Sequence, residues 1–181
     1  MLPEPLHPAV VHFPIVLGVL LPFFAIGAVI MIRRGADLRP AWAITFALCA
    51  VLAVSAFAAT RTGSEDEEIV EDVFSEHLIE EHEEAGDRFL WLSGAALALA
   101  ALGFAPGTAG LVGRYGTAVG SIAIVAAGLQ TGHLGGELVY EHGAAAAHVS
   151  AASGESAQGG DEDGDDEHED DDEDDDEEDD D

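Results

Sequence analysis

Four long apolar runs constrain this chain more than any other feature of its sequence. A membrane-spanning helix needs about 20 mainly apolar residues. Because lipid offers the backbone no hydrogen-bond partners, a continuous apolar span satisfies its own polar groups by forming a helix. The sequence therefore predicts an all-α integral membrane four-helix bundle in a lipid bilayer. The predicted spans are Ala9–Ile32, Ala41–Thr60, Arg88–Phe104 and Thr117–Tyr140.

The C-terminal end of the chain has a different composition. The segment Asp161–Asp181 consists almost entirely of Asp and Glu and cannot bury apolar surface, so it is predicted to be disordered. We therefore expect a four-span membrane domain over residues 1–143 and a disordered acidic tail over residues 144–181. The net charge of −30 and the absence of lysine argue against nucleic acid as a partner, because a phosphate backbone would be repelled.

The arginines between the spans predict the orientation in the membrane. Arg33, Arg34 and Arg39 lie between the first and second spans, and Arg114 lies between the third and fourth. Loops rich in Lys and Arg stay in the cytoplasm. The sequence therefore predicts a multi-pass protein of the cell membrane with both termini extracytoplasmic.

The loop between the second and third spans is expected to contain its own helix. Ser64 and Glu67 have the spacing of a capping box, with Ser64 as the N-cap. We therefore predict an extracytoplasmic amphipathic helix that starts near Glu65 and extends into the third span. Its apolar stripe recurs at helical spacing and comprises Val70, Phe74, Leu78, His82, Ala85 and Phe89.

Glycines are frequent in the fourth span. Gly116 and Gly120, and then Gly128, Gly132 and Gly136, fit the small-xxx-small pattern of close helix contacts. We expect these contacts to lie within the chain, and a homodimer is the alternative. Prolines in the first span are expected to kink it.

Three pairs of histidines lie at the same end of three different spans. Ionisable side chains near a membrane core are costly and usually functional, so their convergence predicts a site. A helical rise of about 1.5 Å per residue places the lower member of each pair near the outer boundary of the apolar layer. The pairs are His7 and His12, His77 and His82, and His133 and His142.

Helical geometry predicts which of these rings face inward, because residues five apart point about 140° away from each other. His82 shares the apolar stripe, so His77 is expected to face outward. The predicted cofactor-binding residues are His12, His82 and His133. Two further candidate metal ligands, His7 and His142, are expected to lie above them.

Charged residues at the same height are candidate partners of the site. Arg61 ends the second span and could pair with Asp87, with Glu137 or with an anionic ligand group such as a propionate. Glu137 follows His133 by four residues, so it lies on the same helix face. There its carboxylate could accept a hydrogen bond from the imidazole and so fix the orientation of the ring.

Three chemistries fit such a site. Two imidazoles on facing helices can ligate a haem iron. Three imidazoles with a carboxylate can hold a transition metal such as Zn, Cu or Fe. The histidines could instead form a structural network or relay protons.

Our leading interpretation is a redox protein that holds haem b or a metal and exchanges electrons with a membrane redox partner. The alternative is a non-catalytic membrane component, or a partner-binding subunit, with a structural histidine cluster. Motifs for a nucleophile, a phosphate loop or Cys-x-x-Cys are absent, so no catalytic residue is assigned.

Three motifs resemble those of domain-of-unknown-function family 2231, a family of small predicted membrane proteins. The resemblance covers about residues 5–143 and implies four spans, but it implies no established activity. The three motifs are His7-Pro-Ala-Val-Val-His-Phe-Pro14, His82-Glu-Glu-Ala-Gly-Asp87 and Gly132-His-Leu-Gly-Gly-Glu-Leu-Val-Tyr-Glu-His-Gly143.

Overall fold

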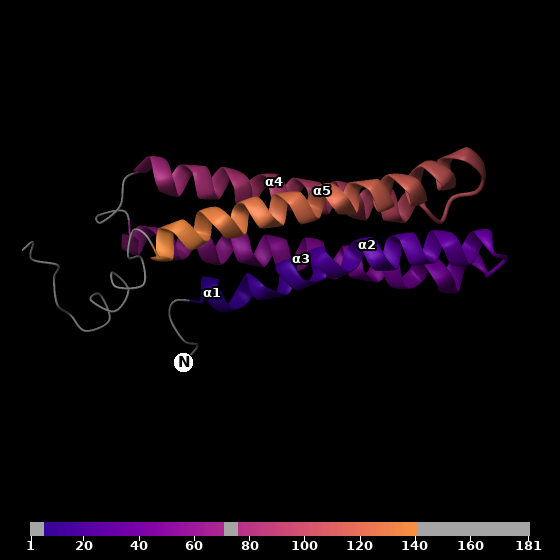
Figure 1. Ribbon diagram of the computed structural model, residues 1–181, viewed down its shortest axis with the longest axis horizontal. Coiled ribbons are helices and arrows are strands. Elements are labelled where there is room, and N and C mark those ends of the chain that lie inside the picture. Colours follow the sequence, from indigo (N-terminus) through magenta and orange to yellow (C-terminus); the bar gives the residue numbers. More distant parts are fainter. Residues whose placement is uncertain (1–5, 71–75, 141–181) are drawn as a thin grey trace, which may run out of the picture.

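The computed structural model describes residues 6–70 and 76–140, and within these ranges the chain is helical, with no strand (Figure 1). His142 and the acidic tail lie outside the described residues. Four helical stretches are long and apolar enough to cross a membrane, which confirms the predicted all-α four-span architecture. The helices are α1 His7–Val10, α2 His12–Arg33, α3 Leu38–Val70, α4 Glu76–Leu102 and α5 Gly107–Tyr140.

The long helices pack as a ring in which α2 contacts α3, α3 contacts α4, α4 contacts α5 and α5 contacts α2. Figure 1 shows the two short connections, α2–α3 and α4–α5, at one end of the bundle. The helix α1, the start of α4 and the end of α5 lie at the other end. We call these the arginine end, which holds Arg33, Arg34, Arg39 and Arg114, and the histidine end, which holds His7, His82 and His133.

A proline separates α1 from α2. Pro14 has no backbone N–H, so it cannot donate a hydrogen bond to the carbonyl of Val10 four residues earlier. The helix is interrupted at Val11 for this reason, and His7 belongs to a short helix of its own. Pro22 lies inside α2, which continues through it.

The second span extends further than its apolar run. The prediction that Ser64 caps a new helix was wrong, because α3 continues through Ser64 to Val70. The Ser64 hydroxyl donates to the carbonyl of Thr60, a bond made within a helix. Glutamate favours the helical conformation, so the backbone hydrogen bonds of α3 continue beyond the residues that are needed to cross the bilayer. Among the described residues, α4 extends the third span upstream of its apolar run as far as Glu76.

The apolar surface of the bundle agrees with a lipid environment. Large side chains such as Phe23, Val54, Trp91 and Val119 are exposed all around it. Soluble proteins rarely expose contiguous apolar surface of this kind. The protein is therefore a multi-pass membrane protein whose helices sit in a bilayer.

Small residues let α4 and α5 approach closely. A Cβ added at Gly116 would meet Leu99, and one at Gly128 would meet Phe89, so both glycines pack within the chain. A Cβ added at Gly120, Gly132 or Gly136 would meet nothing within 4 Å.

A buried hydrogen bond ties α3 to α4 near the arginine end. Trp42 is fully buried, and its Nε1–H donates to the carbonyl of Ala100 at 2.8 Å. Replacing Trp42 with Phe removes this donor and leaves a small void. We expect the substitution to destabilise the protein by about 1–3 kcal/mol.

Thermal unfolding in detergent would measure this effect. Trp91→Phe is the matched control, because Trp91 is 77% exposed on the bundle surface. We expect it to change stability by no more than about 0.5 kcal/mol. Equal effects of the two substitutions would contradict the role assigned to Trp42.

Candidate functional site

Two of the predicted histidines meet inside the histidine end. The rings of His7 on α1 and His82 on α4 lie with their centroids 6.2 Å apart and their planes at 90°. Among the described residues, the helices α1 and α4 do not pack against each other, so the two imidazoles extend toward each other across the bundle. We call them the histidine pair.

The His7 ring is held by α3. Its Nδ1 lies 2.9 Å from the carbonyl oxygen of Ala59 and 3.4 Å from the Thr62 hydroxyl. Because a carbonyl only accepts hydrogen bonds, we assign the proton to Nδ1 and the ring lone pair to Nε2.

The His82 ring contains a polar atom that lacks a partner. The half-buried ring interacts with the backbone of Thr131 on α5. Its Nδ1 is buried and has no hydrogen-bond partner among the described residues. A buried nitrogen left without a partner costs about 1–3 kcal/mol. Such an atom in a native protein therefore calls for an explanation, and a bound ligand is one.

Two glycines make room for the rings. A Cβ added at Gly63 of α3 would lie 3.1 Å from the His7 ring, and one at Gly135 of α5 would lie 3.0 Å from the His82 ring. Both imidazoles thus lie directly against the backbone of a neighbouring helix. Four helices, α1, α3, α4 and α5, shape the surroundings of the histidine pair.

The predicted inward set is not brought together. His12 and His133 are exposed on the outside of the bundle, and only His82 of the three faces inward. His7 and His12 point about 140° apart on a helix, and His7 is the one that faces the centre. Gly135 contacts His82, and a residue two positions away points about 200° around the helix. His133 must therefore face outward.

The neighbouring charged residues also lie outside the histidine pair. Arg61 is exposed and its guanidinium stacks over the ring of Phe57 at 5.2 Å, rather than pairing with Asp87 or Glu137. Asp87 is exposed as well. Glu137 does lie beside His133, with its Oε1 3.7 Å from Nε2, but this ion pair is on the surface.

His77 faces outward as predicted. Its side chain is 77% exposed and lies 3.7 Å from Glu81, four residues along α4. Within residues 6–70 and 76–140, no group of three or more His, Cys, Asp or Glu side chains is arranged to hold a metal ion. His142, the remaining candidate metal ligand, is outside those ranges.

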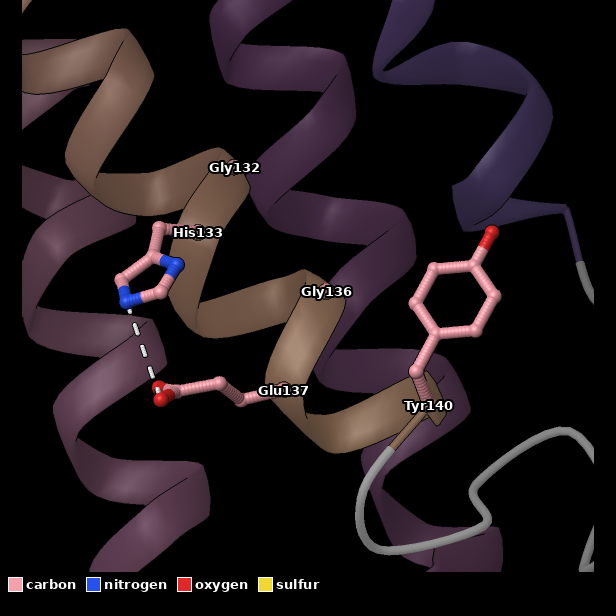
Figure 2. Close-up of a pocket in the computed structure, with 5 residues that line it drawn as sticks. All are labelled: Gly132, His133, Gly136, Glu137 and Tyr140. Carbon is pink, nitrogen blue, oxygen red and sulfur yellow. Dashed lines mark ion pairs between the residues drawn. The ribbon is translucent and has the colours of Figure 1, made fainter.

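A shallow, open depression of about 310 Å³ lies on the surface of the last turns of α5. Figure 2 shows His133 and Glu137 on one side of the helix and Tyr140 reaching out on the other. We call this hollow the α5 pocket, and its lining residues are Gly132, His133, Gly136, Glu137 and Tyr140.

A family model described as "Predicted membrane protein (DUF2231)" matches residues 3–148. The chain belongs to this family. No curated protein and no solved structure gives a significant match. The DUF2231 match confirms the resemblance drawn from the three histidine motifs and the four spans that it implied.

Gly63 and Gly135, which lie against the histidine pair, were not predicted as site residues from the sequence. Gly63 follows Thr62 near the end of the second span, and Gly135 lies within the Gly132–Gly136 stretch. A glycine inside a helix costs roughly 0.5–1 kcal/mol relative to alanine, so its presence there signals a close approach. The sequence carried that signal but not the identity of the approaching ring.

Proposed function

We propose that this protein binds haem b at the histidine end, with the imidazoles of His7 and His82 as axial ligands, and transfers electrons there. One observation supports this proposal above the others. Two imidazoles from different helices lie 6.2 Å apart, and the Nδ1 of one of them is buried without a partner among the described residues.

The set of donor atoms fits haem better than a bare metal ion. Zinc sites use three or four protein ligands, and the described residues offer no such group. A haem iron takes its equatorial ligands from the porphyrin and needs at most two from the protein. The histidine pair supplies two.

The surroundings of the histidine pair also suit this role. Ligating histidines usually donate their second N–H to a carbonyl or carboxylate, which fixes the ring orientation. His7 makes such a contact with the carbonyl of Ala59. A macrocycle between the rings requires them to turn out of their present contact.

Two imidazole ligands indicate the kind of chemistry. A haem held by these two imidazoles would carry electrons to and from a membrane redox partner. The four arginines near the α2–α3 and α4–α5 connections lie at the opposite end. By the positive-inside rule, we place the histidine end on the extracytoplasmic side of the cell membrane.

An absorption spectrum of protein purified from haem-replete cells tests the proposal. We expect a Soret band that shifts on reduction with dithionite, and about one haem per chain. Metal analysis on the same sample separates haem iron from zinc or copper. A folded, colourless and metal-free preparation would refute the proposal.

A second function is favoured by the bond between His7 and Ala59, which ties α1 to α3. In this case the histidine pair is structural, and the protein is a non-catalytic membrane component or a partner-binding subunit. His7→Gln distinguishes the two, because a glutamine amide can also donate to that carbonyl. The structural role predicts unchanged behaviour, whereas haem ligation predicts an altered spectrum.

A further inference from the structure

We propose that the outward face of α5 binds a second copy of this chain in a parallel dimer, with a two-fold axis along the membrane normal. The inference goes beyond the proposed function and does not depend on it, because neither His7 nor His82 takes part. Two-fold dimers are the commonest natural homo-oligomers, and in them the same surface of both copies meets itself. Copies inserted in one membrane share their orientation, so their α5 helices can run side by side.

The helix α5 presents one continuous face that no other described helix covers. Among the described residues, α5 packs against α4 and α2 only. Residues spaced in alternating steps of four and three lie on one side of a helix, and six residues of α5 with this spacing are at least partly exposed. Together with the neighbouring Gly132, we call them the α5 face. The six residues are Ile122, Ala126, Leu129, His133, Gly136 and Tyr140.

Two glycines allow a partner helix to come close to this face. Gly132 and Gly136 have the four-residue spacing at which small residues let membrane helices approach each other. A Cβ added at either would meet nothing within 4 Å, whereas one at Gly128 would lie 3.2 Å from the Phe89 ring. Gly128 is therefore packed within the chain, and the other two glycines are uncovered. The α5 pocket lies over them, and a shallow, open hollow suits the rounded surface of a helix.

An ion pair lies beside these glycines on the surface of the span. His133 and Glu137 belong to the fourth membrane-spanning helix, and their Nε2 and Oε1 atoms are 3.7 Å apart. Figure 2 shows both side chains on the same side of the two glycines. Ionisable side chains within membrane spans almost always face a protein interior or a water-filled cavity. The His133 side chain is 75% exposed, so a protein surface that covers it would remove a cost that an acyl chain leaves in place.

The opposite charges of this pair make the α5 face complementary to itself. If His133 of one copy contacts Glu137 of the partner subunit, a two-fold axis creates the reverse contact as well. The two residues are four apart, or about 6 Å along the helix axis. Their side chains already bridge that step within one chain, so they can also bridge it between two helices in close contact. This charge complementarity supports a second copy as the occupant.

The first experiment measures energy transfer between donor-labelled and acceptor-labelled full-length chains in liposomes as lipid is added. We expect saturable transfer for the wild type. Gly132→Leu should weaken dimerisation about tenfold or more, because the larger side chain holds the backbones apart. Gly94→Leu is the matched control. Gly94 is an exposed glycine of α4, away from the α5 face, and a Cβ added there also meets nothing within 4 Å. We expect this variant to dimerise as the wild type does.

A charge exchange tests the contact between the two copies. His133→Asp leaves the α5 face with two acids, and Glu137→Arg leaves it with none, so each variant alone should lose most of its energy transfer. When the two variants are mixed, the new aspartate of one copy faces the new arginine of the other, and the two unchanged residues pair as in the wild type. We expect transfer to return in the mixture, which would also show that both variants fold. A pair made only within one chain is broken in both variants and would not return.

Each result decides for or against the dimer. Wild-type transfer no greater than that of randomly distributed monomers overturns the inference, as do equal effects of Gly132→Leu and Gly94→Leu. Mixed charge variants that remain monomeric overturn the contact between His133 and Glu137 and with it the parallel arrangement. None of these measurements requires haem, so a colourless preparation that dimerises refutes the proposed function alone.

Discussion

If the histidine pair binds haem as we propose, replacing His82 with alanine will leave the protein without it. The His82 ring is the inward imidazole of α4, and its Nδ1 is a buried nitrogen with no partner among the described residues. Without this ligand, nothing in α4 replaces it, because the exposed His77 points away. The measurement is the Soret absorbance per chain after purification, and we expect a loss of at least about tenfold, or 1.4 kcal/mol of binding.

His7→Ala should give a weaker and different effect. The iron would keep His82 and lose its second axial imidazole, so the spectrum should change from low spin to high spin. The haem content should fall less than in the His82 variant, because His7 lies in the terminal turn of the first span, and helix ends open most easily.

The exposed histidines provide the controls. His12→Ala and His133→Ala change histidines of the family-like motifs that face outward, and we expect both to retain full haem. If either of them lost haem as completely as His82→Ala, the ligand set inferred from the histidine pair would be wrong, and the one predicted from the sequence would regain support.

A leucine at position 82 separates loss of the ligand from loss of the fold. Replacing an unpaired buried nitrogen by an apolar group of similar size is neutral or stabilising. We therefore expect His82→Leu to be at least as heat-stable as the haem-free wild type while binding no haem. Unfolding of this variant at a markedly lower temperature would indicate that the imidazole has a structural role.

The spans could be predicted from the sequence because lipid imposes a simple condition on them. About 20 apolar residues are needed to cross the hydrocarbon layer, and each predicted run lies within a helix or ends close to one. The helix ends could not be predicted in the same way. The helix α5 begins at Gly107, ten residues before the predicted start at Thr117, because these residues add little hydropathy but pack against the end of α4.

The end of the bundle that carries the histidines could also be predicted, and so could the inward direction of His82, but the directions of His7, His12 and His133 could not. One residue of uncertainty in helical phase rotates every side chain by about 100°. The bond of His7 to the carbonyl of Ala59 identifies His7 as the inward ring of the first span, and the contact of Gly135 with His82 turns His133 outward. Both ring directions depend on how the helices pack, and they cannot be predicted from a single sequence.

Gly113→Ala is expected to destabilise the protein strongly. The added Cβ would lie 2.6 Å from the carbonyl oxygen of Leu99 and 2.7 Å from the carbonyl carbon of Leu102, and it would also contact the backbone of Gly103. These are backbone atoms of α4 and its end, so no side-chain rotation relieves the contact. The two helices must separate at the arginine end.

The expected cost is about 3 kcal/mol, at the upper end of the usual penalty for overpacking. Gly120→Ala is the matched control, because it is the same substitution two turns further along the same helix, where the new Cβ meets nothing within 4 Å. There an alanine should raise stability by roughly 0.5–1 kcal/mol, since glycine is the poorer helix former. Opposite shifts of the unfolding temperature in detergent are therefore expected from the two variants. A stable Gly113→Ala protein would mean that α4 and α5 do not approach each other as closely as described, and the position of Gly135 against His82 would then also be in doubt.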